Sequence, residues 1–275
     1  MIANDLAVES GRRIPEAVIE RDYVLAWFLN GLAEHPLRDR LAFKGGTALR
    51  RCWFIGYRFS EDMDFTLTGP LVIEDIQAGF RDIYAAVESA SGVRFRIGRE
   101  ARRQGRNNHT FYLEYQGPLP TTNDVKVDIT IDEKICFPLI DRPILRQYEK
   151  FDDLPEGTTV KSYSLEEIVV EKIAALSDRA RNQPRDLYDL WFLLEHGEFW
   201  LPGLKSEFEE KLAFRGRSAE SVLEDVATKE ERLRRLWEQR LAQQMSNLPP
   251  FDNVFRDVSR KLRSADLAPN KLSRS

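Results

Sequence analysis

The chain has 275 residues, of which 42% are hydrophobic and 31% charged, and its 41 basic and 45 acidic side chains give a formal net charge of −4. That length accommodates one large domain or two ordinary ones, with a buried core in either case. No apolar run approaches the roughly 20 residues of a membrane span, and the polar segment from Met1 to Arg13 is unlike a signal peptide. We therefore expect a cytoplasmic protein that does not associate with membranes.

The first part of the chain mixes helical and strand patterns. Apolar residues recur at helical spacing over 15–33 and 73–89, and Ala48 to Ile55 also predicts a helix, which follows two glycines and ends at Gly56. Strands are predicted at 41–43, 59–67, 93–97, 110–115 and 125–131. The clearest is 125–131, where valine and isoleucine alternate with polar side chains, as on a strand with one buried face.

The pattern changes near residue 157. Ser164 and Glu167 have the spacing of a capping box, and helical patterns then cover 164–181, 185–196, 205–212, 218–245 and 251–264. These patterns predict an α+β fold, in which a first domain at 1–157 holds a mixed sheet flanked by helices and a second domain at 158–275 is mostly helical.

Two carboxylates, Asp62 and Asp64, lie on the same face of the predicted strand at 59–67. Residues two apart on a strand are about 7 Å apart at the backbone, so these carboxylates repel each other unless a cation lies between them. Hard oxygen ligands of this kind suit Mg²⁺ better than zinc. A solvated acidic strand face is the ordinary alternative for any single Asp-x-Asp pattern.

Three further features favour a functional site. Gly45 and Gly46 lie between a strand and a helix, where backbone N–H groups can hold phosphate oxygens. A third carboxylate, Asp128, lies on the clearest strand, and Lys126 shares its face and can balance phosphate charge. Three carboxylates that hold two metal ions can activate an attacking oxygen and stabilise a leaving pyrophosphate.

Two segments, Phe43–Leu49 and Arg58–Phe65, resemble the AbiEii/AbiGii toxin family of the nucleotidyltransferase superfamily. The superfamily pattern is a glycine pair, an Asp-x-Asp strand and a single aspartate on a later strand. Glu167–Lys172 and Arg185–Leu190 are similar to later motifs of the family, so the resemblance covers roughly 15–200. It implies a nucleotidyltransferase-like mixed sheet in the first domain. One position departs from the superfamily, in which serine is frequent where this chain has Gly46, although Thr47 can supply a hydroxyl.

The resemblance also implies roles for individual residues. Catalytic roles fall to Asp62, Asp64, Asp128, Lys172 and Asp189, the first three of which also bind the metal. Contacts to the nucleotide are expected from Gly45, Gly46, Thr47, Ser60, Lys126, Arg185 and Asp186. The sequence does not decide between Asp186 and Asp189 as the functional aspartate of its motif.

Lys172 also stands out without the family, because it falls on or beside the apolar face of its predicted helix. One interpretation is a lysine that packs its stem on the core and extends its ammonium group to water. The other is a cation that meets the triphosphate or the charge that develops in the transition state.

Six arginines lie between Arg94 and Arg106, against a single acid, Glu100. In an otherwise acidic protein this stretch is a candidate phosphate-binding surface. RNA contacts are expected from Arg99, Arg102, Arg103 and Arg106. The alternatives are a solvated loop and a docking site for an acidic partner.

The resemblance implies a type IV toxin whose cognate partner is a protein antitoxin. It predicts Mg²⁺-dependent transfer of a nucleotide from an NTP, with CTP, UTP and GTP as candidates, to the 3′ end of tRNA or another RNA, which blocks translation. Two other functions are compatible with the same residues. One is nucleotidyl or phosphoryl transfer to a protein or small molecule, and the other is a non-catalytic module that binds RNA or a partner.

Overall fold

The computed structural model describes residues 14–100 and 107–265, which form two compact units. The sheet unit consists of the described residues up to Glu133, together with Leu139–Tyr163 and Gln244–Ser246. The helical unit consists of Lys134–Pro138, Ser164–Gln243 and the described residues from Asn247 onward. The units therefore interleave along the chain, whereas the sequence predicted a single boundary between residues 157 and 158.

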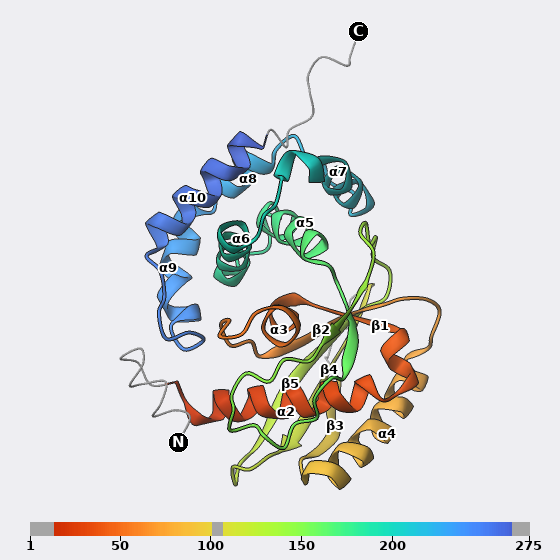
Figure 1. Ribbon diagram of the computed structural model, residues 1–275. Coiled ribbons are helices and arrows are strands. Elements are labelled where there is room, and N and C mark those ends of the chain that lie inside the picture. The colour runs from red at the N-terminus through yellow and green to blue at the C-terminus, as the bar shows by residue number, and fades with distance from the viewer. Residues whose placement is uncertain (1–13, 101–106, 266–275) are drawn as a thin grey trace. The chain divides into compact units, whose positions relative to one another are not determined.

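The described part of the sheet unit holds a mixed sheet of seven strands, in the order β3-β4-β5-β2-β1-β7-β6 (Figure 1). The strands are β1 (Leu41–Lys44), β2 (Asp62–Leu67), β3 (Arg94–Glu100), β4 (Asn108–Gln116), β5 (Thr122–Thr130), β6 (Ile140–Pro143) and β7 (Thr159–Ser162). The pairs β2–β5 and β1–β7 are parallel, and the other neighbouring pairs are antiparallel. The predicted mixed fold class is confirmed, while β6 and β7 were not predicted.

The two strands that carry the carboxylates have the predicted alternation. On β5, Val125, Val127 and Ile129 are buried, whereas Lys126 and Asp128 between them are only partly buried. On β2 the buried residue Met63 separates two partly buried aspartates. Period-2 patterning places alternate side chains on opposite faces, so the apolar residues join the core and the charged ones share the other face.

Helices α2 (Glu16–Ala33) and α4 (Ile73–Ser91) pack against each other in the sheet unit. Helix α4 ends at Gly92, whose left-handed backbone (φ +75°) suits a residue without a side chain. Helix α2 was predicted to be amphipathic but is buried along most of its length, polar residues included. Asp22, for example, is only 1% exposed, and it pairs with Arg50 and Arg51.

The helix after β1 begins earlier than predicted, at the glycines themselves. It starts as α3 (Gly45–Ala48) and continues as a π-helix, η2 (Leu49–Trp53). A short 3-10 helix, η1 (Pro36–Asp39), precedes β1. Glycine is a poor helix former, so helix propensity alone predicted that this helix begins at Ala48. Contacts of both glycines with neighbouring side chains, given below, explain why no other residue fits there.

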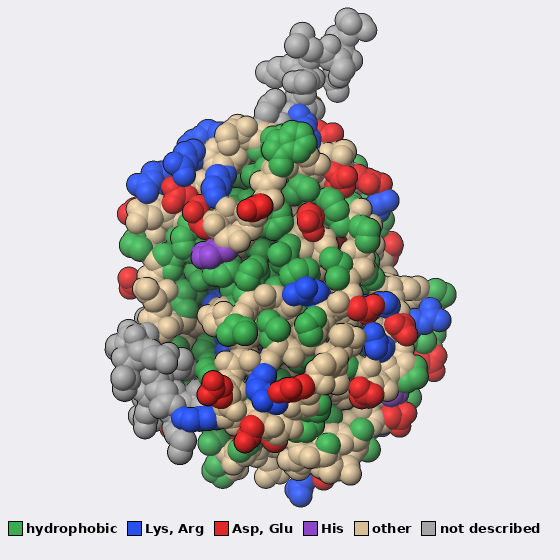
Figure 2. Space-filling view, in the orientation of Figure 1, with side chains coloured by type: hydrophobic (Ala, Val, Ile, Leu, Met, Phe, Trp, Pro, Cys, Tyr) green, Lys and Arg blue, Asp and Glu red, His purple; other side chains and the backbone are tan. Residues whose placement is uncertain are grey.

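The helical unit contains α5 (Leu165–Leu176), α6 (Pro184–His196), η3 (Leu201–Leu204), α7 (Lys205–Phe214), α8 (Val222–Ala227), α9 (Glu230–Leu241) and α10 (Phe251–Ser264). The predicted helix at 218–245 is thus two helices. Figure 2 shows lysine and arginine side chains gathered over α10. Among the described residues, no helix combines the length and the apolar character that crossing a bilayer demands.

Half of the predicted capping box is present at the start of α5. The Glu167 N–H donates to Ser164 Oγ at 3.2 Å, as expected. The Glu167 carboxylate, however, accepts hydrogen bonds from the backbone N–H groups of Cys136 and Phe137 and pairs with buried Lys211 at 2.6 Å. Glu167 therefore fastens the segment 134–138 to the helical unit.

Candidate active site

The three predicted metal-binding carboxylates lie on adjacent parallel strands. In the register of β2 and β5, Asp64 is directly opposite Asp128 and Asp62 is opposite Lys126. Because the side chains of directly paired residues point to the same face, all four charged groups share one patch of the sheet. The structure thus brings together residues that are more than 60 positions apart in the chain.

Both glycines of α3 approach side chains of this patch closely. Gly45 has a left-handed backbone (φ +78°), and a Cβ added there would collide with the Asp64 carboxylate. A Cβ at Gly46 would lie 2.5 Å from Arg58 Nη2 and 3.1 Å from Ser60 Oγ. The first turn of the helix, with its N–H groups, therefore lies against the carboxylates on one side and against a guanidinium and a hydroxyl on the other.

Arg58 is a site residue that sequence reasoning missed. Its side chain is only 2% exposed, and its Nη1 donates to the Phe59 carbonyl and to Gln244 Oε1 at 3.1 and 3.0 Å. The position in the quoted motif, two residues before Ser60, was the available signal. A guanidinium held in this way suits a phosphate that also touches the glycine backbone.

Thr47 has a supporting position. Its hydroxyl donates to the backbone carbonyl of Asp62, which ties α3 to the start of β2. The hydroxyl that was expected to replace the serine of the superfamily is thus used to hold β2, the strand with two of the predicted metal ligands. Ser60 is only 7% exposed, and its hydroxyl lies beside Gly46.

Lys126 acts as an internal counter-ion in this patch. It donates to Asp128 Oδ2, while the hydroxyl of Thr110 donates to Asp128 Oδ1. Burial alone would lower the pKa of Lys126, but the hydrogen bond and charge of Asp128, with the charges of Asp62 and Asp64, raise it above its usual value. The ammonium group thus stays protonated and partly neutralises three carboxylates.

The donor set fits Mg²⁺ in its chemistry. Asp62, Asp64 and Asp128 supply only hard oxygen atoms, which Mg²⁺ prefers, and no cysteine or histidine interrupts them on the two strands. Over 14–100 and 107–265, no three potential ligand side chains already converge on one point. Asp128 is engaged by Lys126 and Thr110, so a cation held by this carboxylate would compete with the ammonium group.

We expect Lys126→Met to make the metal-free protein less stable and to tighten Mg²⁺ binding. The three carboxylates would lose their counter-ion, and an ion would no longer compete with the ammonium group. The apparent affinity for Mg²⁺ should rise roughly tenfold, a moderate value for one unit charge removed near a partly exposed site. Melting temperatures across a Mg²⁺ titration measure both effects, with Lys126→Arg as the charge-preserving control. Equal Mg²⁺ affinity in all three proteins would contradict the counter-ion role.

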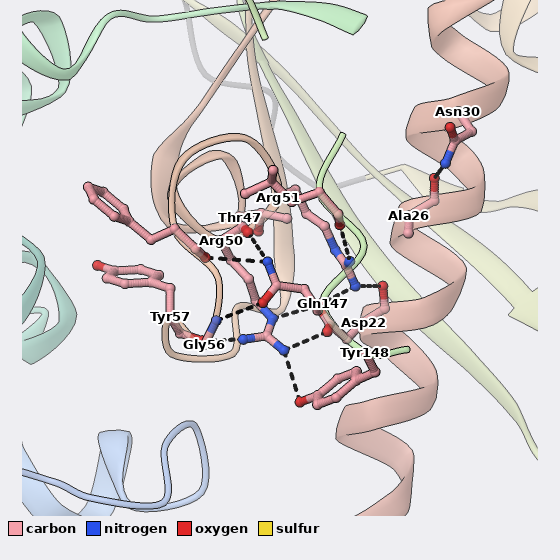
Figure 3. A network of polar contacts seen from close by, with 12 residues as sticks. Asp22, Ala26, Asn30, Thr47, Arg50, Arg51, Gly56, Tyr57, Gln147 and Tyr148 are labelled. Carbon is pink, nitrogen blue, oxygen red and sulfur yellow. Dashed lines mark hydrogen bonds and ion pairs between the residues drawn. The ribbon is translucent and has the colours of Figure 1, made fainter. Parts of the chain in front are cut away.

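A network of buried charges supports the helix that starts at the glycines (Figure 3). Asp22 on α2 accepts from Arg50 Nε at 2.8 Å and Nη2 at 2.7 Å, and from Arg51 Nη2 at 2.7 Å. All three side chains are at most 2% exposed. Burial by itself would raise the pKa of Asp22, but Arg50 and Arg51 hold it below its usual range. Two guanidinium groups thus share one carboxylate inside the core.

The same network extends to the segment that leads into β2. Arg50 donates to the Tyr57 carbonyl and lies 4.0 Å from the centre of the Phe59 ring. Gln147 Nε2 donates to the Arg50 carbonyl, and its Oε1 accepts from the Gly56 N–H at 3.0 Å (Figure 3). The network therefore fixes the π-helix and the segment before Ser60 relative to α2. Its residues were not predicted, because nothing local in the sequence pairs α2 with residues 28 positions later.

The remaining predicted catalytic residues form a second group in the helical unit. Lys172 Nζ lies 2.9 Å from Asp186 Oδ1 and 2.7 Å from Asp189 Oδ2, and the lysine is only 8% exposed. Arg181 also pairs with Asp186, at 2.6 Å. Burial alone would raise the pKa of Asp186, but Lys172 and Arg181 lower it far below its usual range. Arg185, on the same helical turn as Asp186, is partly exposed.

This geometry changes the expectation for Lys172. The ammonium group of Lys172 does not extend to water, because Asp186 and Asp189, the two aspartates of the later motif, pair with it. Asp186 and Asp189 therefore share one function at least, which is to hold Lys172 between α5 and α6. The lowered pKa of Asp186 stabilises the fold at neutral pH, and this contribution is lost as the pH falls below the usual carboxyl range.

We expect Lys172→Met to destabilise the protein by about 3–5 kcal/mol, because it leaves buried Asp189 without this cation. Urea unfolding measures the loss. The double variant Lys172→Met with Asp189→Asn removes the uncompensated charge and should recover most of the stability. If activity returns with stability in the double variant, Lys172 is structural only. If stability returns and activity does not, the Lys172–Asp189 pair has a role in the reaction beyond its role in the fold.

The arginine stretch at 94–106 lies only partly within the described residues. Arg102, Arg103 and Arg106 lie outside the described residues. Among the described members, Arg94 pairs with Glu88 at 3.0 Å, and Arg96 pairs with Glu114. Arg99 lies 3.4 Å from Asp124 and 4.0 Å from the centre of the Tyr112 ring. Each of these three charges is thus balanced by an acid on the same unit, which weakens the RNA interpretation for them.

Comparison with known proteins shows the family of the chain and a similar fold. The family described as "Nucleotidyl transferase AbiEii toxin, Type IV TA system" matches residues 27–257. MenT4, a nucleotidyltransferase toxin from Mycobacterium tuberculosis H37Rv, is similar in fold, with a TM-score of 0.51 and 17% sequence identity over 97% of this chain and 99% of that one. No curated protein matches the sequence.

Proposed function

Because the chain belongs to the AbiEii nucleotidyltransferase toxins of type IV toxin–antitoxin systems, we propose that it transfers a nucleotide from an NTP to the 3′ end of tRNA or another RNA and so blocks translation. The observation that carries the proposal is the register of β2 and β5, which sets Asp64 opposite Asp128 beside the helix that begins at Gly45. A carboxylate patch next to a helix N-terminus suits a triphosphate with its metal ions.

Different groups of the chain would bind different parts of the nucleotide. The backbone N–H groups at Gly45 and Gly46 and the Ser60 hydroxyl would hold triphosphate oxygens, and Arg58 would offset their charge. These donors are already fixed by the Asp22 network and by Gln244, so little reorganisation accompanies binding. In the helical unit, Lys172 and its two aspartates form the other functional group implied by the family motifs.

Asp62, Asp64 and Asp128 would hold Mg²⁺, which when bound polarises phosphate oxygens and makes the acceptor hydroxyl more acidic. Asp128 is the carboxylate with a hydroxyl and an ammonium group on its two oxygens. Lys126, on the same face of the sheet, would balance phosphate charge. In the cell, a cognate protein antitoxin in the cytoplasm would restrain the activity.

The decisive experiment measures whether a radiolabelled phosphate of the nucleotide is transferred to RNA or to protein. Purified protein is incubated with Mg²⁺, total RNA and each NTP labelled at the α- or γ-phosphate, and RNA and protein are then separated. Label from the α-phosphate in RNA, with release of pyrophosphate, supports the proposal. Label in protein, or transfer of the γ-phosphate, would assign the site to the alternative transfer reactions. No Mg²⁺-dependent incorporation with any NTP would leave only a binding function.

A further inference from the structure

The charges of the helical unit are segregated. Between Lys229 and Arg263, which spans α9 and α10, nine lysines and arginines stand against five acids. Between Glu195 and Glu210, one lysine stands against five acids. The unit therefore presents a local excess of positive charge on α9 and α10, and Figure 2 shows this excess over α10.

Three exposed arginines form a stripe along α10. Arg256, Arg260 and Arg263 follow one another at intervals of four and three residues, so they share one face, about 6 and 4.5 Å apart along the helix axis. Asp257 is shared between Arg256 and Arg260, at 3.6 and 3.5 Å, so one carboxylate stands against two guanidinium groups. A cation near a helix C-terminus is favourable in itself, which accounts for Arg263 but not for Arg256 in the second turn.

A groove of about 460 Å³ lies beside this stripe, within the helical unit. Its lining is mainly apolar, from Leu223, Val226, Ala227, Phe255 and Leu262, and it includes Arg256, Ser259 and Arg263. The lining also contains two acids, Glu230 and Asp252, but Arg234 pairs with both of them. With Arg234 counted, three guanidinium groups stand against two carboxylates at the groove, which leaves one net positive charge.

We propose that this groove and the arginine stripe bind single-stranded RNA, with a base in the apolar slot and consecutive phosphates on Arg256, Arg260 and Arg263. Planar guanidinium groups at regular spacing suit a repeating phosphate backbone, and an apolar slot beside them suits an unstacked base. An acidic peptide would also meet the arginines but has no planar apolar group at each charge. The inference rests on the proposed function, in that it places the RNA acceptor on a surface outside the metal-binding patch.

The test is RNA binding by the full chain without NTP, measured at several salt concentrations with a short single-stranded RNA of mixed sequence. Replacing Arg256, Arg260 and Arg263 together with serine should flatten the dependence of log K on log salt by about 2, the value for three phosphates of a single strand. The control removes the same number of charges elsewhere, with serine at the exposed sheet-unit residues Arg40, Arg81 and Lys150, and should keep the wild-type slope. An unchanged slope in the α10 variant would overturn the inference.

A second pair of variants leaves every arginine in place. Ser259 lies three residues after Arg256 and four before Arg263, so Ser259→Glu would pair with both and repel phosphate. It should weaken RNA binding at least about tenfold at low salt, the effect of a charge reversal near several phosphates, whereas Ser259→Gln, of equal size, should change binding little. Equal binding by both would contradict the proposal.

Because the readout is binding, failure of the transfer reaction is seen separately. One outcome is that the wild-type protein fails to label RNA while RNA affinity is lost in the α10 variants and kept in the control. That result would support the RNA-binding surface and contradict the proposed reaction. If the α10 variants bind RNA normally and escape neutralisation by the antitoxin, the inference is wrong and the stripe belongs to a protein partner.

Discussion

Asp64→Asn is expected to abolish nucleotidyl transfer, with a loss of at least about 10³-fold, while the melting temperature of the metal-free protein does not fall. Asp64 lies opposite Asp128 on the neighbouring strand and against the backbone of Gly45, so it is at the centre of the patch. Asparagine keeps the shape but removes one of three neighbouring negative charges. The remaining carboxylates then repel each other less, but bind Mg²⁺ poorly.

Release of pyrophosphate and incorporation of labelled nucleotide measure this loss, and thermal unfolding with and without Mg²⁺ measures the effect on the fold. Asp124→Asn is the matched control, because Asp124 is an exposed acid on β5 outside the patch. The stabilisation by Mg²⁺ should shrink in Asp64→Asn and persist in the control. Full activity of Asp64→Asn at ordinary Mg²⁺ concentrations would rule out this site.

Asp22→Asn is expected to destabilise the protein by about 3–5 kcal/mol, because two buried guanidinium groups would lose the carboxylate that they share. A domain is typically stable by about 5–15 kcal/mol, so much of the margin would be lost. The melting temperature should fall by about 10 °C. The π-helix and the segment before Ser60 would lose their anchor on α2 together.

Arg51→Met tests whether the excess charge, and not the loss of contacts, causes this effect. It leaves a bidentate pair of Arg50 with Asp22, and it removes the arginine whose pKa is lowered, first by burial and also by the charge of Arg50. We expect a much smaller loss than in Asp22→Asn, since a balanced pair remains. Chemical unfolding of the two variants side by side gives the comparison. Equal losses would mean that hydrogen bonds to the backbone, such as that from Arg51 to the Leu145 carbonyl, matter more than charge.

The sequence was sufficient to predict the strands that carry the site, because their pattern is local. Alternation of apolar and charged residues identified β5 and the part of β2 with Asp62 and Asp64. The pairing of these two strands was not predictable, since no local feature sets a parallel register between residues 64 positions apart. Strands β6 and β7 were missed because each has four residues and lacks a clear alternation.

Buried charge is the other point at which sequence reasoning failed. The spacing of apolar residues in α2 predicted an amphipathic helix, but its polar residue Asp22 is buried because its partners come from η2. Similarly, Lys172 on α5 was expected to face either solvent or nucleotide, and its pairing with two aspartates of α6 was not predicted. In both cases the partner that permits burial is supplied by tertiary structure, which residue patterns along one helix do not contain.

The chain returns to the sheet unit at Gln244–Ser246, so no single cut along the chain separates the two units. The Phe59 N–H donates to the Gln244 carbonyl at 2.6 Å, and the Gln244 side chain accepts from Arg58, next to Gly46 and Ser60. An N-terminal fragment that stops at Tyr163 would therefore contain all three predicted metal-binding carboxylates and still lack the support of the segment with Arg58 and Ser60. A premature stop codon anywhere before residue 244 would remove that support as well, whereas an internal deletion that joins 163 to 244 through a linker would retain it.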